Sequence, residues 1–165
     1  MLTRLHFGRP VAGLVIVIAG SLLLFFNNPP AIQVLAYFLP AVSIQLLQGS
    51  ARPYLGWAGA FLILGSLAGS AFVPADRVYD PYSQNALPVL VAFVGSMLAL
   101  ALGTALVGFS MVGGRYFPGA WGYAVAISAI APVLIPLPVS PLAIVYVLLG
   151  ARTLLSTGPA TSPTA

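Results

Sequence analysis

Few side chains of this sequence could carry out acid–base, nucleophilic or metal chemistry. Its 165 residues include two Asp, six Arg and one His, with no Glu, Lys or Cys. A single histidine, His6, cannot form a multi-histidine metal site, and the absence of cysteine excludes thiol nucleophiles and cysteine-ligated metals. No phosphate-binding loop, nucleophile elbow or metalloprotease motif occurs. We therefore expect no catalytic residue, no cofactor and no metal, and predict that the protein is not an enzyme.

Both carboxylates lie in one polar segment, PADRVYDPYSQN at 74–85. Asp76 and Asp80 flank Arg77 there, and Tyr82 follows closely. The group could form a local ion pair, bind a cation weakly or serve a membrane enzyme. Because two carboxylates fall short of the usual calcium ligand set, a solvated connector is the favoured interpretation and an enzyme the least favoured one.

Polar side chains also gather in one apolar segment at 31–48, where they are Tyr37, Ser43, Gln45 and Gln48. Gln45 and Gln48 stand three residues apart and share one face of a helix. They could line the cavity of a small carrier or channel for a neutral or apolar solute. The favoured alternative is that they bond to neighbouring helices or reach the inner membrane interface. Tyr146, in the last apolar segment, also needs a partner for its hydroxyl, and Thr104 and Ser128 are candidates.

The elements that position these residues must be membrane helices, because the chain is too poor in charge to face water. Apolar residues make up 60% of it and charged residues 5%, against about a quarter in soluble domains. This composition excludes soluble globular and disordered classes. The six arginines stand singly and form no basic patch, which excludes a nucleic-acid partner. The predicted environment is the lipid bilayer.

Charged and proline-rich breaks divide the sequence into apolar stretches, and one crossing needs about 20 residues. The predicted fold is all-α, with six transmembrane helices arranged as three hairpins. We expect a single membrane domain at 1–155, followed by a disordered tail at 156–165. The spans are predicted at about 10–26, 31–48, 54–73, 86–111, 119–135 and 139–155. The last two are short, so a re-entrant hairpin there remains open.

The arginines predict the orientation of these spans. Six spans place Arg77 alone on one side, and on the other side Arg4, Arg9, Arg52, Arg115 and Arg152. The positive-inside rule then places both termini in the cytoplasm, and we expect the plasma membrane. Apart from Arg152 near the inner end of the last span, the predicted spans contain no ionisable side chain other than tyrosine. This argues against a proton relay or acid–base catalysis inside the membrane.

Small residues recur at intervals that suit helix packing. Gly65 and Gly69 form one such pair, and Ala120, Ala124 and Ser128 form a second series. Small residues let helix backbones approach closely in lipid. Packing within the chain is the favoured use, while packing between chains stays open.

From these features we predict a non-enzymatic integral membrane protein that acts by helix–helix association, as an accessory subunit or membrane scaffold. Its partner would be another membrane protein or a second copy of the chain.

Overall fold

The computed structural model describes residues 8–25, 30–47, 52–71, 86–114, 116–134 and 140–156, and all regular structure within them is helical. The six helices begin and end within two residues of the segments predicted from the sequence, which confirms an all-helical chain. They are α1 (Arg9–Phe25), α2 (Pro30–Leu47), α3 (Pro53–Ala71), α4 (Ala86–Met111), α5 (Gly119–Leu134) and α6 (Pro141–Leu155).

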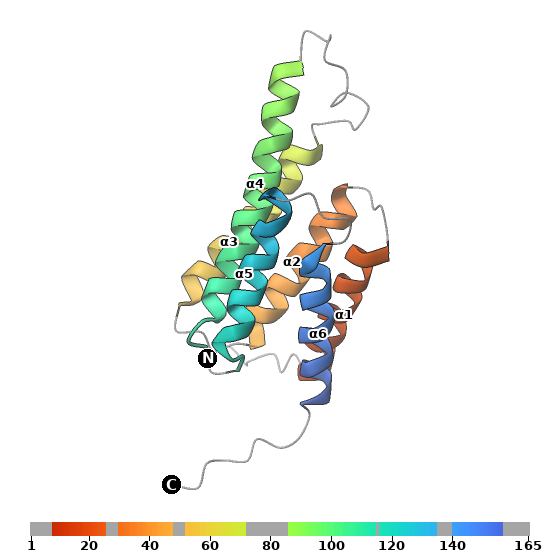
Figure 1. Cartoon of the computed structure of the whole chain (residues 1–165), viewed down its shortest axis with the longest axis vertical. Helices are drawn as coiled ribbons and strands as arrows, with labels where there is room; N and C mark the ends of the chain where they lie inside the picture. The colour runs from red at the N-terminus through yellow and green to blue at the C-terminus, as the bar shows by residue number, and fades with distance from the viewer. Residues whose placement is uncertain are drawn as a thin grey trace, which may run out of the picture.

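Successive helices run in opposite directions (Figure 1). As a result α1, α3 and α5 begin, and α2, α4 and α6 end, at the same end of the bundle. Arg9, Arg52 and Arg152 all belong to these helix ends, so we call it the arginine end. Each helix packs on its neighbours in the sequence, and α1 also packs on α6, which closes the ring. The most extensive contacts join α3 to α4 and α1 to α6.

The helices differ in length. At about 1.5 Å per residue, the 26 residues of α4 extend about 39 Å. The other helices have 15 to 19 residues. Among the described residues, one stretch, Leu87–Met111, is long and apolar enough to cross a membrane. The first part of α4 projects with the end of α3 beyond the other helices (Figure 1).

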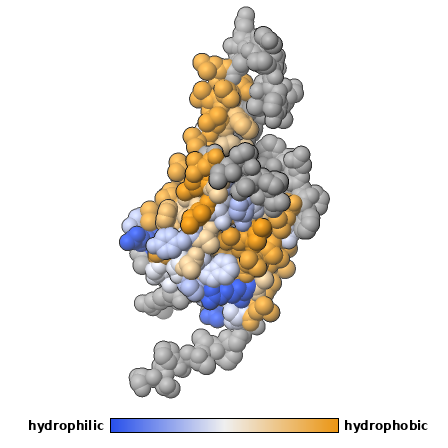
Figure 2. All heavy atoms as spheres, viewed as in Figure 1, coloured by the Kyte–Doolittle hydropathy of each residue, from blue (hydrophilic) through white to orange (hydrophobic). Residues whose placement is uncertain are grey.

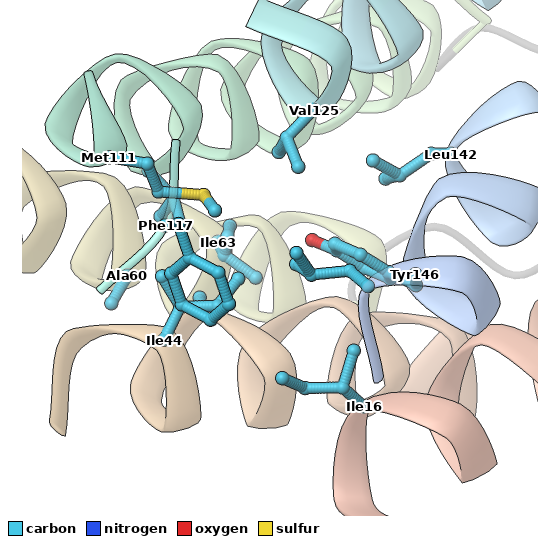
Figure 3. Packing of buried hydrophobic residues seen from close by; sticks show 12 residues of the cluster. Ile16, Ile44, Ala60, Ile63, Met111, Phe117, Val125, Leu142 and Tyr146 are labelled. Carbon is cyan, nitrogen blue, oxygen red and sulfur yellow. The ribbon is translucent and has the colours of Figure 1, made fainter. Parts of the chain in front are cut away.

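The centre of the bundle is filled by buried side chains from all six helices (Figure 3). The largest fully buried ones include Tyr146, Ile16, Ile44, Ile63 and Met111. Phe117, which precedes α5, closes this cluster toward the arginine end, where it packs edge-on against Tyr116 at 4.7 Å between ring centres. The helices therefore surround a packed interior.

Three reciprocal pairs of glycines bring helix backbones into contact. The pairs are Gly59 with Gly103, Gly108 with Gly122, and Gly13 with Gly150. A methyl group on Gly103 would lie 2.7 Å from the carbonyl oxygen of Gly59, and one on Gly150 would lie 2.7 Å from that of Gly13. Only hydrogen fits at such a distance. These pairs therefore set the spacing of α3 to α4, α4 to α5 and α1 to α6.

Replacement of Gly59 by alanine tests this spacing. The new methyl group would collide with the backbone oxygen of Gly103, which cannot move without separating α3 from α4. We expect Gly59→Ala to lower the free energy of unfolding in detergent by about 1–3 kcal/mol. Gly65→Ala on the same helix is the matched control, because no described atom lies within 4 Å of the added methyl group. The control should stay within about 0.5 kcal/mol of wild type. Equal losses in both variants would contradict the proposed role of the pair.

Candidate functional site

The polar residues of α2 include one that joins two helices. The Gln45 side-chain amide donates a hydrogen bond from Nε2 to Oγ of Ser110 on α4, at 2.8 Å. Ser110 is fully buried and its hydroxyl donates to the carbonyl oxygen of Val107, at 2.7 Å. Gly56 of α3 lies directly against the Gln45 amide, where any larger side chain would displace it. Gln45 therefore connects α2 to α4 next to α3.

The remaining polar residues predicted in the interior differ in how deeply they are buried and in their hydrogen-bond partners. Ser43 is buried on α2, and Tyr37, half-buried, packs against the core. Tyr146 is fully buried, and its hydroxyl points away from α6 into the bundle (Figure 3). That hydroxyl has no hydrogen-bond partner among the described residues. Thr104, one candidate for it, donates instead to the carbonyl oxygen of Leu100 on its own helix, at 2.8 Å.

A cavity of about 290 Å³ lies between α2, α4 and α5. Its polar side chains are Tyr37 and Ser128, and its remaining wall is apolar, including Phe93, Met97 and Pro132. Pro132 lies inside α5 and has no N–H, so the carbonyl oxygen of Ser128, four residues earlier, lacks its helical partner. The cavity could hold a small apolar molecule with one hydrogen-bonding group. It does not include Gln45 or Tyr146.

The small-residue series of the sequence analysis lies mostly away from the close helix contacts. Gly65 is exposed and has open space beside it among the described residues. On α5, Ala120 is exposed, Ala124 is half-buried and Ser128 is buried. The face of α5 that meets α4 at closest range carries Gly122 instead. Gly69 belongs to α3, but the contacts of this residue are not among those that the structure describes.

Five other candidate residues lie outside the described parts of the chain. They are Gln48, Asp76, Arg77, Asp80 and Tyr82. Within the described parts, no three His, Cys, Asp or Glu side chains gather where they could hold a metal ion. What the described side chains offer chemically is a set of hydroxyls, the amide of Gln45 and the guanidinium groups of Arg9, Arg52 and Arg152.

Spacing along one helix does not predict the glycine pairs, because the two members of each pair belong to different helices. A different signal could have found one pair. Gly108 and Gly122 each lie seven residues from Arg115, so a hairpin turning there brings them opposite each other. No comparable signal links Gly13 to Gly150, which come from the two ends of the chain.

Comparison of the chain with family models, with curated proteins and with solved structures finds no match to any of them.

The bond between Gln45 and Ser110 can be measured by a double-mutant cycle. We expect Gln45→Leu and Ser110→Ala to show a coupling free energy of about 0.6 kcal/mol, with an upper range near 1.7, which is the range found for hydrogen bonds between membrane helices. The measurement is reversible unfolding of the four proteins in mixed micelles. Gln45→Leu combined with Thr104→Val is the control, because Thr104 bonds only within α4 among the described residues, and its effects should add. Additive effects for the Ser110 pair would show that the bond contributes nothing.

Proposed function

We propose that this chain is a six-helix integral membrane protein of the plasma membrane, with both termini in the cytoplasm, that acts by helix–helix association. It would serve as an accessory subunit of a membrane complex or as a membrane scaffold. The arginine end would face the cytoplasm, in accord with the positive-inside rule.

The chemistry of the outer surface supports a lipid environment. Large apolar side chains are exposed on every helix, for example Leu14 on α1, Leu46 on α2, Phe61 on α3, Ile127 on α5 and Leu155 on α6. Hydrophobic surface covers much of the bundle in Figure 2. An apolar surface that surrounds a protein is stable in lipid and leads to aggregation in water.

The projecting part of α4 is the observation that carries the association proposal. Leu87 is 71% exposed and Val91 is 63% exposed, and both precede Phe93, the first residue of α4 that lines the cavity shared with α2 and α5. At about 39 Å, α4 is also longer than a hydrocarbon core of about 30 Å. A helix longer than the hydrocarbon core tilts, kinks or locally thickens the bilayer, each at a modest cost in free energy, and that cost drives some helix–helix association. A partner helix along this part of α4 would cover its exposed apolar side chains and accommodate the excess length of the helix.

The interior supports association over conduction. Gln45 bonds to Ser110, Thr153 bonds to the carbonyl oxygen of Leu149, and the buried cluster fills the space between the helices. Polar groups that are used in packing are not available to line a pore. A carrier for a small neutral or apolar solute is the second candidate, and the cavity beside Tyr37 and Ser128 favours it.

Cysteine labelling tests the six-span topology, and the chain has no native cysteine to interfere. With a membrane-impermeant maleimide on intact cells, we expect Asn28→Cys, Ser83→Cys and Val139→Cys to react. Ser50→Cys and Ser162→Cys should react only after permeabilisation. Position 139 is preferred to Ser140, whose hydroxyl oxygen is buried. Protection at 139 alone would replace the last two spans by a re-entrant hairpin, and labelling of Ser50→Cys from outside would refute the topology.

Photo-crosslinking tests the association. A photoreactive amino acid at Val91, on the projecting part of α4, should crosslink to protein in native membranes, as a partner or a second copy. The same group at Ile127 on α5 is the control, because it is equally exposed, at 66%, but lies within the main bundle. It should crosslink mainly to lipid. Crosslinks to lipid alone at both positions would reject association through α4 and favour the carrier.

A further inference from the structure

Two arginines from opposite ends of the chain meet at the arginine end. Arg9 begins α1 and Arg152 lies in the last turn of α6, and the packing of these two helices brings both side chains to one cavity of about 100 Å³. The rest of the cavity wall comes from Tyr116, Phe117, Thr153 and Ser156. It is small enough to suit a single polar group, such as a phosphate.

Aromatic rings hold both guanidinium groups in place. Cζ of Arg9 lies 5.1 Å from the ring centre of Tyr116, and Cζ of Arg152 lies 5.9 Å from that of Trp121. Stacking of this kind orients a guanidinium by its face and leaves its N–H donors free to bind at its edge. The Tyr116 hydroxyl lies 3.3 Å from Oγ of Ser156, which itself donates to the carbonyl oxygen of Thr153. The cavity wall is thus built from interacting side chains.

The charge of this cavity is not balanced by the described protein. No Asp or Glu occurs among the described residues, so neither Arg9 nor Arg152 has a carboxylate partner there. Helix dipoles do not supply a counter-charge either. The positive end of α1 and the negative end of α6 lie side by side at this end and oppose each other. Two fixed positive charges around one cavity favour an anion.

An apolar groove continues from the cavity along the outside of the bundle. It has a volume of about 560 Å³, shares Arg152 and Ser156 with the cavity, and is otherwise lined by Trp121, Leu148, Ala151 and Leu155. Leu155 is 84% exposed. Hydrophilic surface lies next to hydrophobic surface at this end of the bundle in Figure 2. An anion site that opens into an apolar groove matches a molecule with a charged head and a hydrocarbon chain.

We propose that Arg9 and Arg152 bind the phosphodiester of an anionic phospholipid from the cytoplasmic leaflet, with an acyl chain in the groove along Trp121 and Leu155. The guanidinium edges donate to the phosphate oxygens, a pairing for which arginine geometry is well suited. A bound lipid would then join α1, α6 and the segment before α5, which carries Tyr116. This inference rests on the membrane location in the proposed function, and it assigns a ligand to one end of the bundle.

Reconstitution into lipid nanodiscs tests the site. We would incorporate the protein into discs of equal parts phosphatidylglycerol and phosphatidylcholine, extract it gently, and measure the retained lipids by native mass spectrometry. The wild type should retain phosphatidylglycerol in preference to phosphatidylcholine. Arg9→Gln with Arg152→Gln should reduce that preference about thirtyfold, because each arginine near a membrane surface adds about one kcal/mol of attraction to anionic lipid and two are removed. Arg9→Lys with Arg152→Lys should keep most of it, which separates loss of charge from loss of fold.

Arg52→Gln is the matched control, because Arg52 lies at the same end but lines neither the cavity nor the groove. An equal loss in this control would mean that general membrane charge explains the preference, and would overturn the site. Inorganic phosphate, added to the protein in detergent, should protect it from thermal unfolding less than phosphatidylglycerol does; equal protection would overturn the lipid assignment. Failure of the protein to enter nanodiscs would reject the membrane proposal, whereas insertion without lipid preference would reject this inference alone.

Discussion

The close approach of helix backbones at paired glycines is the constraint on which the rest of this structure depends. In the proposed membrane location, lipid would give little hydrophobic drive for one apolar helix to leave it for another, so packing between helices would have to be tight to be stable. At Gly59 and Gly103, and again at Gly108 and Gly122, the backbones of α3, α4 and α5 touch. Because α4 contributes to both contacts, it holds these three helices as one unit. Gly13 and Gly150 do the same for α1 and α6.

Polar side chains add specific hydrogen bonds to this packing. The hydrogen bond from Gln45 to Ser110 connects α2 to α4. Gly56 of α3 lies against the Gln45 amide, and because glycine has no side chain it leaves space for that amide. Several other described hydroxyls bond to carbonyl oxygens of their own helices, as those of Thr104 and Thr153 do. Tyr146 is an exception, since its buried hydroxyl has no described partner. A bundle organised in this way keeps its polar groups inside and presents apolar side chains outward.

This organisation bears on both proposals. A buried cluster at the centre and an apolar exterior suit a protein whose interactions take place along its sides, and the first part of α4 carries large exposed apolar side chains on one of those sides. The arginine end differs from the other surfaces, because charge is concentrated there beside an apolar groove. A protein partner along α4 and a lipid at Arg9 and Arg152 would occupy different parts of the molecule. The two proposals can therefore hold together or fail separately.

The sequence by itself determined the number of helices, their approximate ends and their alternating directions. Charged residues and prolines interrupt an otherwise apolar chain, and an apolar stretch between such breaks has little choice but to form a helix. It also indicated that Gln45 would bond to a neighbouring helix. The sequence could not show which small residues meet, because nearly every face of these helices is apolar and hydropathy does not distinguish a buried face from a lipid-facing one. Gly65 and Ala120 were candidates on spacing alone, yet both are exposed.

Only the tertiary structure decided that α1 packs on α6. That contact brings together Gly13 with Gly150, and Arg9 with Arg152, across nearly the whole length of the chain. Helix periodicity relates residues within one element, and hairpin turns relate adjacent elements. Closure of a ring depends on the combined packing angles and lengths of all the helices between its two ends. No local sequence pattern therefore predicts it.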